Sequence, residues 1–313
     1  RPDADGGGTV YRTEGAELRA FDGRHLDLEN AAAPFERPEL LVFASKHAGE
    51  TDELLTAHHT GNFGAAEYGG DDGRFARAAP NAHRVVVDAL ADYAPEGYDV
   101  GVECTHHGPT EVGVPSMFVE VGSAEPQWRD PAAARAVARA ILDLRGVPAD
   151  TPVENGQRRQ LVGFGGGHYA PRFERIVRET DWAVGHVGAD WCLDALAEWA
   201  DRQAPRDTDD PYDTVLDRAF AESNAEYALV TGDHPALTER LTSLGYRVVD
   251  ERFLRETTGV PLAFVETMEA AVEAVDDGLR FGEPATTGVG DWRVVTLPAE
   301  LLAEATGIDP EAV

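Results

Sequence analysis

Lysine is almost absent from this sequence. Lys46 is the only lysine among 313 residues, so arginine supplies nearly all of the 27 basic side chains that face 57 acidic ones, and the net charge is −30. Such a surface suits very concentrated salt, because the mutual repulsion of carboxylates is screened when the Debye length falls to roughly 3 Å at 1 M. We therefore expect a protein of an extreme halophile that needs salt to fold. The alternative is an ordinary acidic protein that avoids nucleic acids.

Long apolar runs and paired cysteines are missing as well. No run of about 18 apolar residues occurs, so we expect no membrane-spanning helix. The first eight residues are polar and glycine-rich, which predicts no signal peptide. Cys104 and Cys192 form no CxxC motif, so we expect reduced thiols in a cytoplasmic protein, with Cys104 in a structural role. The sequence does not begin with Met, which suggests that it begins inside the natural chain.

Apolar runs alternate with amphipathic stretches that begin at Pro or Asp-Pro. This alternation predicts an α/β fold with a central, mixed or mostly parallel sheet flanked by helices. Residues 1–254 are expected to form this domain, and residues 255–313 a less regular, acidic C-terminal extension. We expect four strands in one sheet, at Leu40–Ala44, Val100–Glu103, Phe118–Val121 and Leu161–Phe164.

Three polar loops follow predicted strands. The first, Lys46–Asp72, has no clear periodicity, and a loop of this length is usually functional. The second is Glu103–Met117, in which Gly108-Pro109 breaks the chain, and the third is Gly165–Tyr169. Because sites in open α/β sheets form at the carboxyl ends of strands, we expect imidazoles from at least two of these loops to share a pocket. Six of the ten histidines lie in the loops: His47, His58, His59, His106, His107 and His168.

Imidazole and carboxylate groups bind zinc and move protons near neutral pH. A catalytic zinc takes about three protein ligands and keeps a position for water. We infer that its ligands come from His58, His106, His107, His168 and Glu103. A polar surface turn is the plain alternative for each pair of adjacent histidines.

The lone lysine and the triple glycine suggest an anion site. Lys46 supplies a point charge for a phosphate or an oxyanion, although a lysine can equally be a solvated surface charge. Gly165, Gly166 and Gly167 precede Pro171, which predicts the start of a helix whose free N–H groups face an anion. A flexible turn is the alternative, and the spacing matches neither a Walker A nor a GxGxxG motif.

The loops also carry a family resemblance, over roughly Tyr11 to Asp250. The sequence resembles the archaeal-type D-aminoacyl-tRNA deacylase family in five strings: Ser45-Lys46-His47, His58 with Thr60-Gly61-Asn62, Thr105-His106-His107-Gly108-Pro109-Thr110-Glu111, Val114-Pro115-Ser116, and Gly165-Gly166-Gly167-His168-Tyr169-Ala170-Pro171. It departs from the family in three places. The usual first strand and helix have no counterpart, Phe63 stands where the family often has Trp, and an acidic segment follows about Arg255.

The resemblance implies a zinc-dependent hydrolase of the ester that links a D-amino acid to tRNA, with a role in clearing aldehyde-modified aminoacyl-tRNA. The implied fold is similar to peptidyl-tRNA hydrolase and nucleoside phosphorylases. The expected partner is the aminoacylated 3′ end of tRNA, with no DNA or membrane.

Ester hydrolysis needs an activated water, an oxyanion stabiliser and a grip on the terminal adenosine. We assign general-base chemistry to Glu111 or His47, and stacking on the adenine to Tyr169 or Phe63. The remaining predicted residues are Thr105 and Lys46 as catalytic groups, and Asn62, Gly165, Gly166, Gly167 and Arg172 as substrate-binding groups. The candidate tRNA-facing basic patch is Arg158, Arg159, Arg172, Arg175 and Arg178.

Two other functions stay open from the sequence. A metal-free phosphorylase or nucleosidase would use the glycine loop for phosphate, and its metal content would distinguish it. A non-catalytic module that binds the tRNA 3′ end would bind without turnover, but it gives no reason for so many histidines in three loops.

Overall fold

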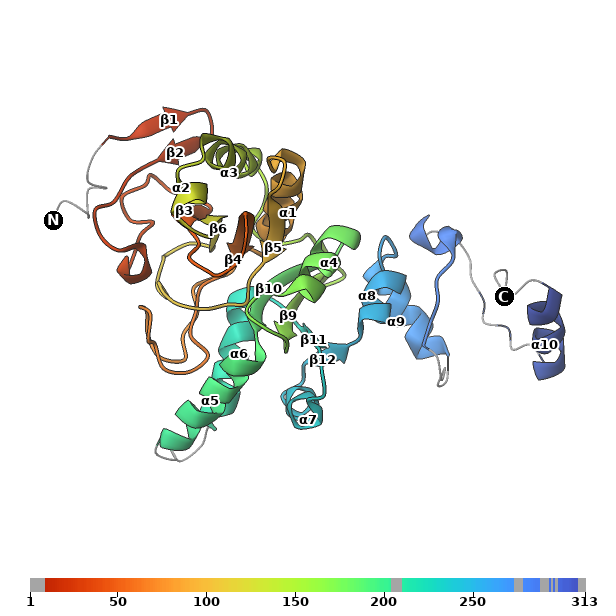
Figure 1. Cartoon of the computed structure of the whole chain (residues 1–313). Coiled ribbons are helices and arrows are strands. Elements are labelled where there is room, and N and C mark those ends of the chain that lie inside the picture. Colours follow the sequence, from red (N-terminus) through yellow and green to blue (C-terminus); the bar gives the residue numbers. More distant parts are fainter. Residues whose placement is uncertain are drawn as a thin grey trace. The chain divides into compact units, whose positions relative to one another are not determined.

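The computed structural model describes residues 9–203, 210–272, 278–287, 293, 295 and 298–308. The chain divides into two units, with the boundary after Thr258. The first unit holds two four-stranded sheets and the second is helical in its described parts (Figure 1). No helix among the described residues is both long and apolar enough to cross a lipid bilayer.

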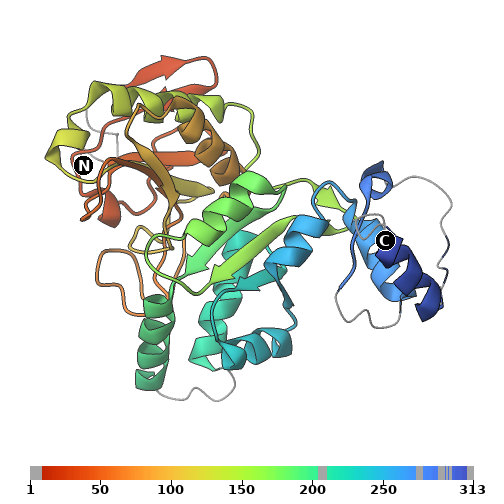
Figure 2. The same ribbon diagram turned by 45° about the vertical axis from the view of Figure 1, so that its right-hand side comes forward.

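The first sheet is mixed, with strand order β3-β6-β4-β5. β3 runs parallel to β6, β4 antiparallel to β6, and β5 parallel to β4. Helices α1 and α3 pack against each other and against this sheet, and they lie side by side in both views (Figure 1, Figure 2). The bounds are β3 Leu41–Lys46, β4 Leu54–His58, β5 Asp99–Val102, β6 Ser116–Gly122, α1 Pro80–Tyr93 and α3 Pro131–Asp143.

The second sheet is wholly parallel, with strand order β10-β9-β11-β12. Its two middle strands β9 and β11 are nearly continuous apolar runs, as expected for parallel strands buried on both faces. Helix α1 also contacts β10, so it joins the two sheets. The bounds are β9 Gln160–Phe164, β10 Ala183–Gly188, β11 Tyr227–Val230, β12 Arg247–Val249, α4 Pro171–Glu179, α5 Asp190–Arg202, α6 Pro211–Ser223, α7 Pro235–Ser243 and α8 Glu251–Glu256.

Smaller elements complete the described structure. Those of the first unit are two hairpins, a 3₁₀ turn and a short helix: β1 Tyr11–Thr13 with β2 Ala16–Leu18, β7 Val153–Glu154 with β8 Gln157–Arg158, η2 His25–Asp27 and α2 Glu125–Trp128. Those of the second unit are α9 Leu262–Ala271, η3 Glu283–Thr287 and α10 Ala299–Ile308. The predicted boundary after residue 254 falls within α8, and the predicted C-terminal extension contains α9, η3 and α10 in its described parts.

The α/β class is confirmed, but the prediction of four strands in one sheet is wrong. Three of the predicted strands correspond to β3, β5 and β6, whereas Leu161–Phe164 belongs to β9 in the second sheet. The predicted long loop Lys46–Asp72 is also wrong, because β4 lies inside it and pairs with two strands. Every residue of β4 is buried, so its sequence shows no alternation of polar and apolar residues that would indicate a strand.

Candidate active site and metal centre

One face of the first sheet carries imidazole, carboxylate and aromatic side chains. Register pairs His58 with Phe118 and Thr56 with Glu120, and paired residues project from the same face. The rings of His58 and Phe118 stack at a centroid distance of 5.3 Å. His58 is the last residue of β4, Glu103 directly follows β5, and His168 lies in the loop after β9, so these side chains lie at or just after the carboxyl ends of strands, where the sequence predicts them. Glu120 is the exception, because it lies inside β6.

Glu103 lies at the centre of this group and is 1% exposed. It follows β5 and forms an isolated bridge with Tyr169, which brings the glycine loop of the second sheet to the first. Its Oε2 accepts a hydrogen bond from His168 Nε2 at 2.9 Å, and its Oε1 lies 3.2 Å from His47 Nδ1. The two sheets thus contribute imidazoles to opposite sides of one buried carboxylate.

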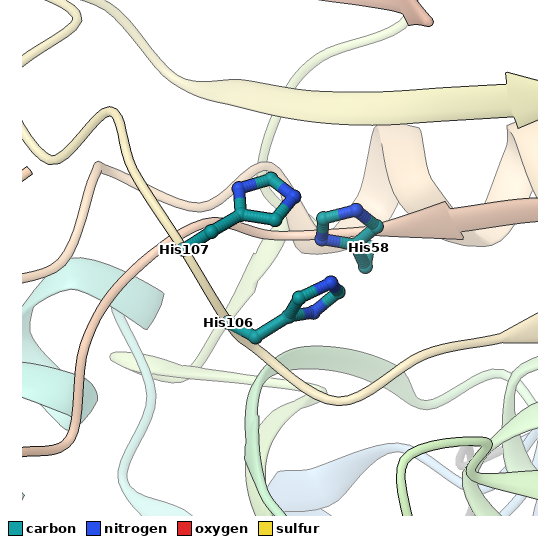
Figure 3. Close-up of side chains that lie close together, drawn as sticks. All are labelled: His58, His106 and His107. Atoms are coloured by element: carbon teal, nitrogen blue, oxygen red, sulfur yellow. The ribbon is translucent and has the colours of Figure 1, made fainter. Parts of the chain in front are cut away.

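Three histidines share a further feature, which fixes their protonation. The Nδ1 of His58 lies 3.0 Å from the carbonyl of His59, that of His106 2.8 Å from the carbonyl of Cys104, and that of His107 2.7 Å from the carbonyl of Gly108. A carbonyl oxygen only accepts, so each Nδ1 carries the hydrogen, and each neutral ring keeps its lone pair on Nε2. Figure 3 shows the three rings gathered together, His58 from the end of β4 and His106 and His107 from the loop that follows β5.

These side chains fit a metal ion. Four overlapping groups offer ligand atoms that lie within 4.8 Å of one another: His58, His106 and His107; Cys104, His106 and His168; His47, Glu103 and His168; and His58, Glu103 and Glu120. Two atoms in these groups, His58 Nε2 and Glu103 Oε1, are buried without a hydrogen bond. Nitrogen, carboxylate and thiolate donors are the ligands that zinc prefers, so the donor set and the unsatisfied atoms both suit it.

The ionisation of the group is uneven. Burial alone lowers the pKa of His47, but the carboxylates of Glu103 and Glu120 outweigh it and raise this pKa to about 11. Hydrogen bonds to Cys104 and Glu103 raise the pKa of His168 to about 9. Burial and the neighbouring His106 lower the pKa of His107 to about 3. The cluster therefore holds protons beside Glu103. At its other end the imidazole nitrogens are unprotonated, and their lone pairs can bind a cation.

The structure brings together many of the predicted site residues. All five predicted ligands lie in the groups above, and His47 joins them through Glu103. His47 Nε2 lies 2.8 Å from the hydroxyl of Tyr169, so Tyr169 also borders the cluster. Lys46 is exposed, with its ammonium 4.8 Å from the ring centroid of Trp128, and in register it pairs with Val121 rather than with Glu120.

Other predicted residues lie elsewhere or are engaged. Phe63 is 3% exposed and packs against Phe75 and Phe164, so stacking of Phe63 on a base is not possible in this arrangement. Glu111 is exposed and belongs to none of the four groups. Thr105 is buried, with its hydroxyl bonded to His186 and to the N–H of Val187.

The predicted substrate-binding residues are also engaged within the fold. The N–H of Gly166 donates to Asp190 at 3.1 Å, and the amide of Asn62 donates to two carbonyls of its own loop. Gly165 has φ +93, and a Cβ there would lie 2.1 Å from the carbonyl oxygen of Thr231, so glycine is required. Gly167 lies in the sequence between Gly166 and His168.

The predicted basic patch is largely neutralised. Arg172 and Arg175 pair with Glu251, and Arg178 pairs with Glu174. Arg159 is 5% exposed and bonds Glu154, Asp181 and the Thr257 carbonyl. The guanidinium of Arg158 donates to the carbonyl of Thr151.

Sequence reasoning missed Glu120 and assigned Cys104 to structure alone. Glu120 is a lone carboxylate in the apolar run of β6, and a charge inside a buried strand needs partners, which is a usable signal. Cys104 lies 3.8 Å from His168 Nδ1 and belongs to a possible metal group. The ring of His25 also lies near that of Phe118, tilted at a centroid distance of 5.5 Å, so His25 lies closer to the site than its place in the sequence indicated.

Known proteins are similar in sequence to this chain over most of its length. A family model described as D-aminoacyl-tRNA deacylase matches residues 34–247. A D-aminoacyl-tRNA deacylase of Haloarcula marismortui is 66% identical and spans 100% of this chain, which covers 68% of that protein. One of Natronomonas pharaonis is 55% identical, with coverages of 100% and 67%. Both relatives come from haloarchaea, which agrees with the acidic, lysine-poor composition.

A solved structure shares the fold. It is that of a conserved protein of unknown function, with a TM-score of 0.66 and a sequence identity of 28%, and the match covers 80% of this chain and 85% of that one. The similarity to peptidyl-tRNA hydrolase and nucleoside phosphorylases stays a prediction. Because the family model covers more than half of the chain and the relatives match it from end to end, the chain belongs to the D-aminoacyl-tRNA deacylase family.

Proposed function

We propose that this chain hydrolyses the ester bond of D-aminoacyl-tRNA at a zinc ion held by the histidine cluster, releasing the D-amino acid and free tRNA. Family membership supports the reaction. One observation carries the metal assignment: His58, His106 and His107 each direct Nδ1–H to a backbone carbonyl and offer a ligand atom to a common space. Carbonyl-fixed tautomers of this kind are typical of metal-binding histidines.

The three histidines would hold the zinc, with Glu103 and His168 beside them. A zinc ion at such a site lowers the pKa of bound water to about 7 and polarises a carbonyl group. Glu103 is buried and acts as the anionic partner that keeps His47 and His168 protonated. The role of general base falls less well to Glu111, which is exposed and outside the groups.

His47 is suited to supply a proton. Its Nδ1–H faces Glu103, and its Nε2–H donates to the Tyr169 hydroxyl, so a proton can pass along this path to a group that Tyr169 contacts. The reaction needs such a proton, because the departing ribose oxygen of the terminal adenosine must be protonated. We assign His47 as the proton donor and Tyr169 as the side chain that faces the leaving group.

The tRNA contacts are a separate part of the proposal. Lys46 is exposed, and it is the candidate for a phosphate of the tRNA 3′ end. The paired arginines of α4 contribute little net charge, and in molar salt long-range attraction is screened. We expect recognition to rest on short-range contacts, in the cytoplasm where charged tRNA is used. Removal of aldehyde-modified amino acids from tRNA would use the same ester chemistry.

The test combines hydrolysis with metal content. D- and L-aminoacyl-tRNA are incubated in molar KCl with the protein as purified, after exhaustive chelation and after zinc is restored, and bound zinc is counted in each sample. We expect release of the D-amino acid that is lost on chelation and recovered with zinc. His106→Ala and His168→Ala should abolish it, whereas His83→Gln, a buried histidine outside the four groups, should retain it.

Each alternative gives a different outcome. Full activity after exhaustive chelation, or in both His106→Ala and His168→Ala, would reject the metal mechanism and favour a phosphorylase-like enzyme. Binding of tRNA without release of the amino acid, in zinc-loaded protein, would indicate a binding module.

A further inference from the structure

A bulge in β10 contacts Thr105, which lies in the loop that carries His106 and His107. The parallel pairing of β10 with β9 shifts register between Val184 and Val187, so Gly185 and His186 leave the regular ladder. The N–H of His186 donates instead to the Ser223 hydroxyl at 2.9 Å. A Cβ on Gly185 would lie 2.4 Å from that hydroxyl oxygen, so the close approach needs glycine. Bulges re-aim side chains, and this one turns His186 towards the first sheet.

The hydrogen bonds of His186 define a single tautomer. Its Nε2 lies 3.0 Å from the carbonyl oxygen of Ala76, which only accepts, so Nε2 carries the hydrogen. Nδ1 is therefore an acceptor, and the Thr105 hydroxyl donates to it at 3.1 Å. The same hydroxyl oxygen accepts from the N–H of Val187 at 3.0 Å. Both the ring and the hydroxyl are buried and fully bonded.

Thr105 lies in the sequence between Cys104 and His106, two residues of the proposed metal groups. Its backbone N–H donates to the Val187 carbonyl at 2.7 Å, so main chain and side chain are both tied to β10. On one side, the Cys104 carbonyl accepts from His106 Nδ1 and thus orients that ring. On the other side, the chain continues directly into His106 and His107. Thr105 is therefore the point at which β10 fixes this loop.

We propose that His186 is a positioning residue, which acts through the Thr105 hydroxyl to hold the Glu103–His107 loop in its metal-binding arrangement. This inference rests on the proposed metal site. A contact at this distance from the ion orients ligands, and loss of such a contact typically weakens metal affinity by about 10–100-fold. A residue that served only the core would affect stability without affecting the metal.

Paired variants separate the two roles. Thr105→Val keeps the shape of the side chain and removes the hydroxyl, whereas Thr105→Ser keeps the hydroxyl. His186→Gln keeps a donor at the Nε2 position for Ala76, whereas His186→Asn keeps an acceptor at the Nδ1 position for Thr105. The core control is Thr257→Val, because Thr257 is equally buried and its hydroxyl accepts from Trp182 Nε1 at 3.1 Å.

The measurements are zinc affinity, by competition with a chromophoric chelator, the melting temperature of the metal-free protein, and kcat and KM on D-aminoacyl-tRNA. We expect Thr105→Val and His186→Gln to weaken zinc binding by about 10–100-fold. Both variants should lower kcat and leave KM nearly unchanged. Thr105→Ser and His186→Asn should stay within about threefold of wild type, on the same scale. Thr257→Val should lower the melting temperature and leave zinc affinity unchanged.

Three results would overturn the inference. Wild-type zinc affinity in Thr105→Val and His186→Gln, with lowered melting temperatures, would make the pair a core element only. Failure of both variants to fold in molar KCl, while Thr257→Val folds, would have the same meaning. Absence of zinc binding in the wild-type protein would overturn the proposed metal site and this inference together.

Discussion

Two groups of histidines lie on opposite sides of the end of β4. The outer cluster is His47, His58, His106, His107 and His168 with Glu103 and Glu120, and the inner cluster is His59, His83 and His186. His58 and His59 are adjacent in sequence but belong to different clusters. His58 faces Phe118 across the sheet face, whereas the ring of His59 lies 4.8 Å from that of His83 on α1.

The partners of the imidazoles distinguish the clusters. Rings of both clusters bond backbone groups: in the inner cluster His59 bonds the Gly185 carbonyl and the Ala79 N–H, and His83 bonds the Ala57 carbonyl. Only the outer rings also face two buried carboxylates, Glu103 and Glu120. Burial and histidine content are alike in both, so neither identifies a site. An unsatisfied nitrogen beside carboxylates does, and the predictions below test this distinction.

The largest contrast is expected between His58→Ala and His59→Ala. His58→Ala removes a metal ligand and should lower kcat by about a thousandfold or more, because the metal supplies several kcal/mol to the transition state. Its metal-free form should lose less stability than His59→Ala, since Nε2 has no hydrogen bond and only the Nδ1–H bond to the His59 carbonyl is removed. His59→Ala leaves a buried N–H and a buried carbonyl unpaired beside a cavity, which costs about 2–4 kcal/mol of stability.

These two variants are compared by bound zinc, by kcat per folded molecule and by denaturant unfolding in molar KCl. His59→Ala protein that is folded should bind zinc and retain most of its activity. The distinction between the clusters would fail if His59→Ala lost zinc with unchanged stability, or if His58→Ala unfolded like a core variant.

The starts of helices were readable from sequence, because α1, α3 and α4 begin at prolines, as the stretches that begin at Pro or Asp-Pro predict. The division into two sheets was not readable. Strand pairing depends on contacts between distant residues, and Leu161 pairs with Val184 and Tyr227 rather than with the first sheet.

The site was predictable in part for the same reason. Unusual polar residues next to buried strands marked His58, His106 and His168, and the structure gathers them. Their spacing could not separate His58 from His59, because the two point in opposite directions only once β4 is known to be a strand. Glu120 was hidden inside β6, and Thr105 looked catalytic because the bulge that engages its hydroxyl is a feature of β10.

The next contrast is the response of the outer cluster to alkali. Because Glu103 and Glu120 raise the pKa of His47 above its unfolded value, to about 11, the folded protein holds a proton that the unfolded chain releases near pH 6.5. That stabilisation is complete below about pH 6.5 and is lost as pH rises towards 11. The free energy of unfolding of metal-free protein should fall by up to about 3 kcal/mol between pH 7 and 9.

His47→Gln removes this titration and should make the decline over the same range clearly shallower, although His168, whose pKa is raised to about 9, still contributes part of it. The experiment is denaturant unfolding of chelated protein in molar KCl at pH 7, 8 and 9. Parallel declines in wild type and His47→Gln would show that His47 holds no extra proton. Asn62→Ala, which removes a buried amide from a loop outside the cluster, should shift the curve without changing its slope.

The smallest effect concerns the inner cluster, which should respond to acid instead. Burial lowers the pKa of His83 to about 4, since its Nε2–H already donates to Ala57 and its buried Nδ1 has no partner to receive a proton's hydrogen bond. The unfolded chain takes up that proton near pH 6.5, so this contribution to stability is present above pH 6.5 and is lost as pH falls towards 4. His83→Gln keeps the donor to Ala57 but cannot be protonated. Between pH 6.5 and 5 it should therefore lose about 2 kcal/mol less than wild type, at about 1.4 kcal/mol per pH unit. Val87→Ala, a non-titrating change on the same buried face of α1, should lower stability equally at both pH values. If His83→Gln and Val87→Ala give the same pH slope, the inner histidines do not resist protonation, and the two clusters differ less than their hydrogen bonds indicate.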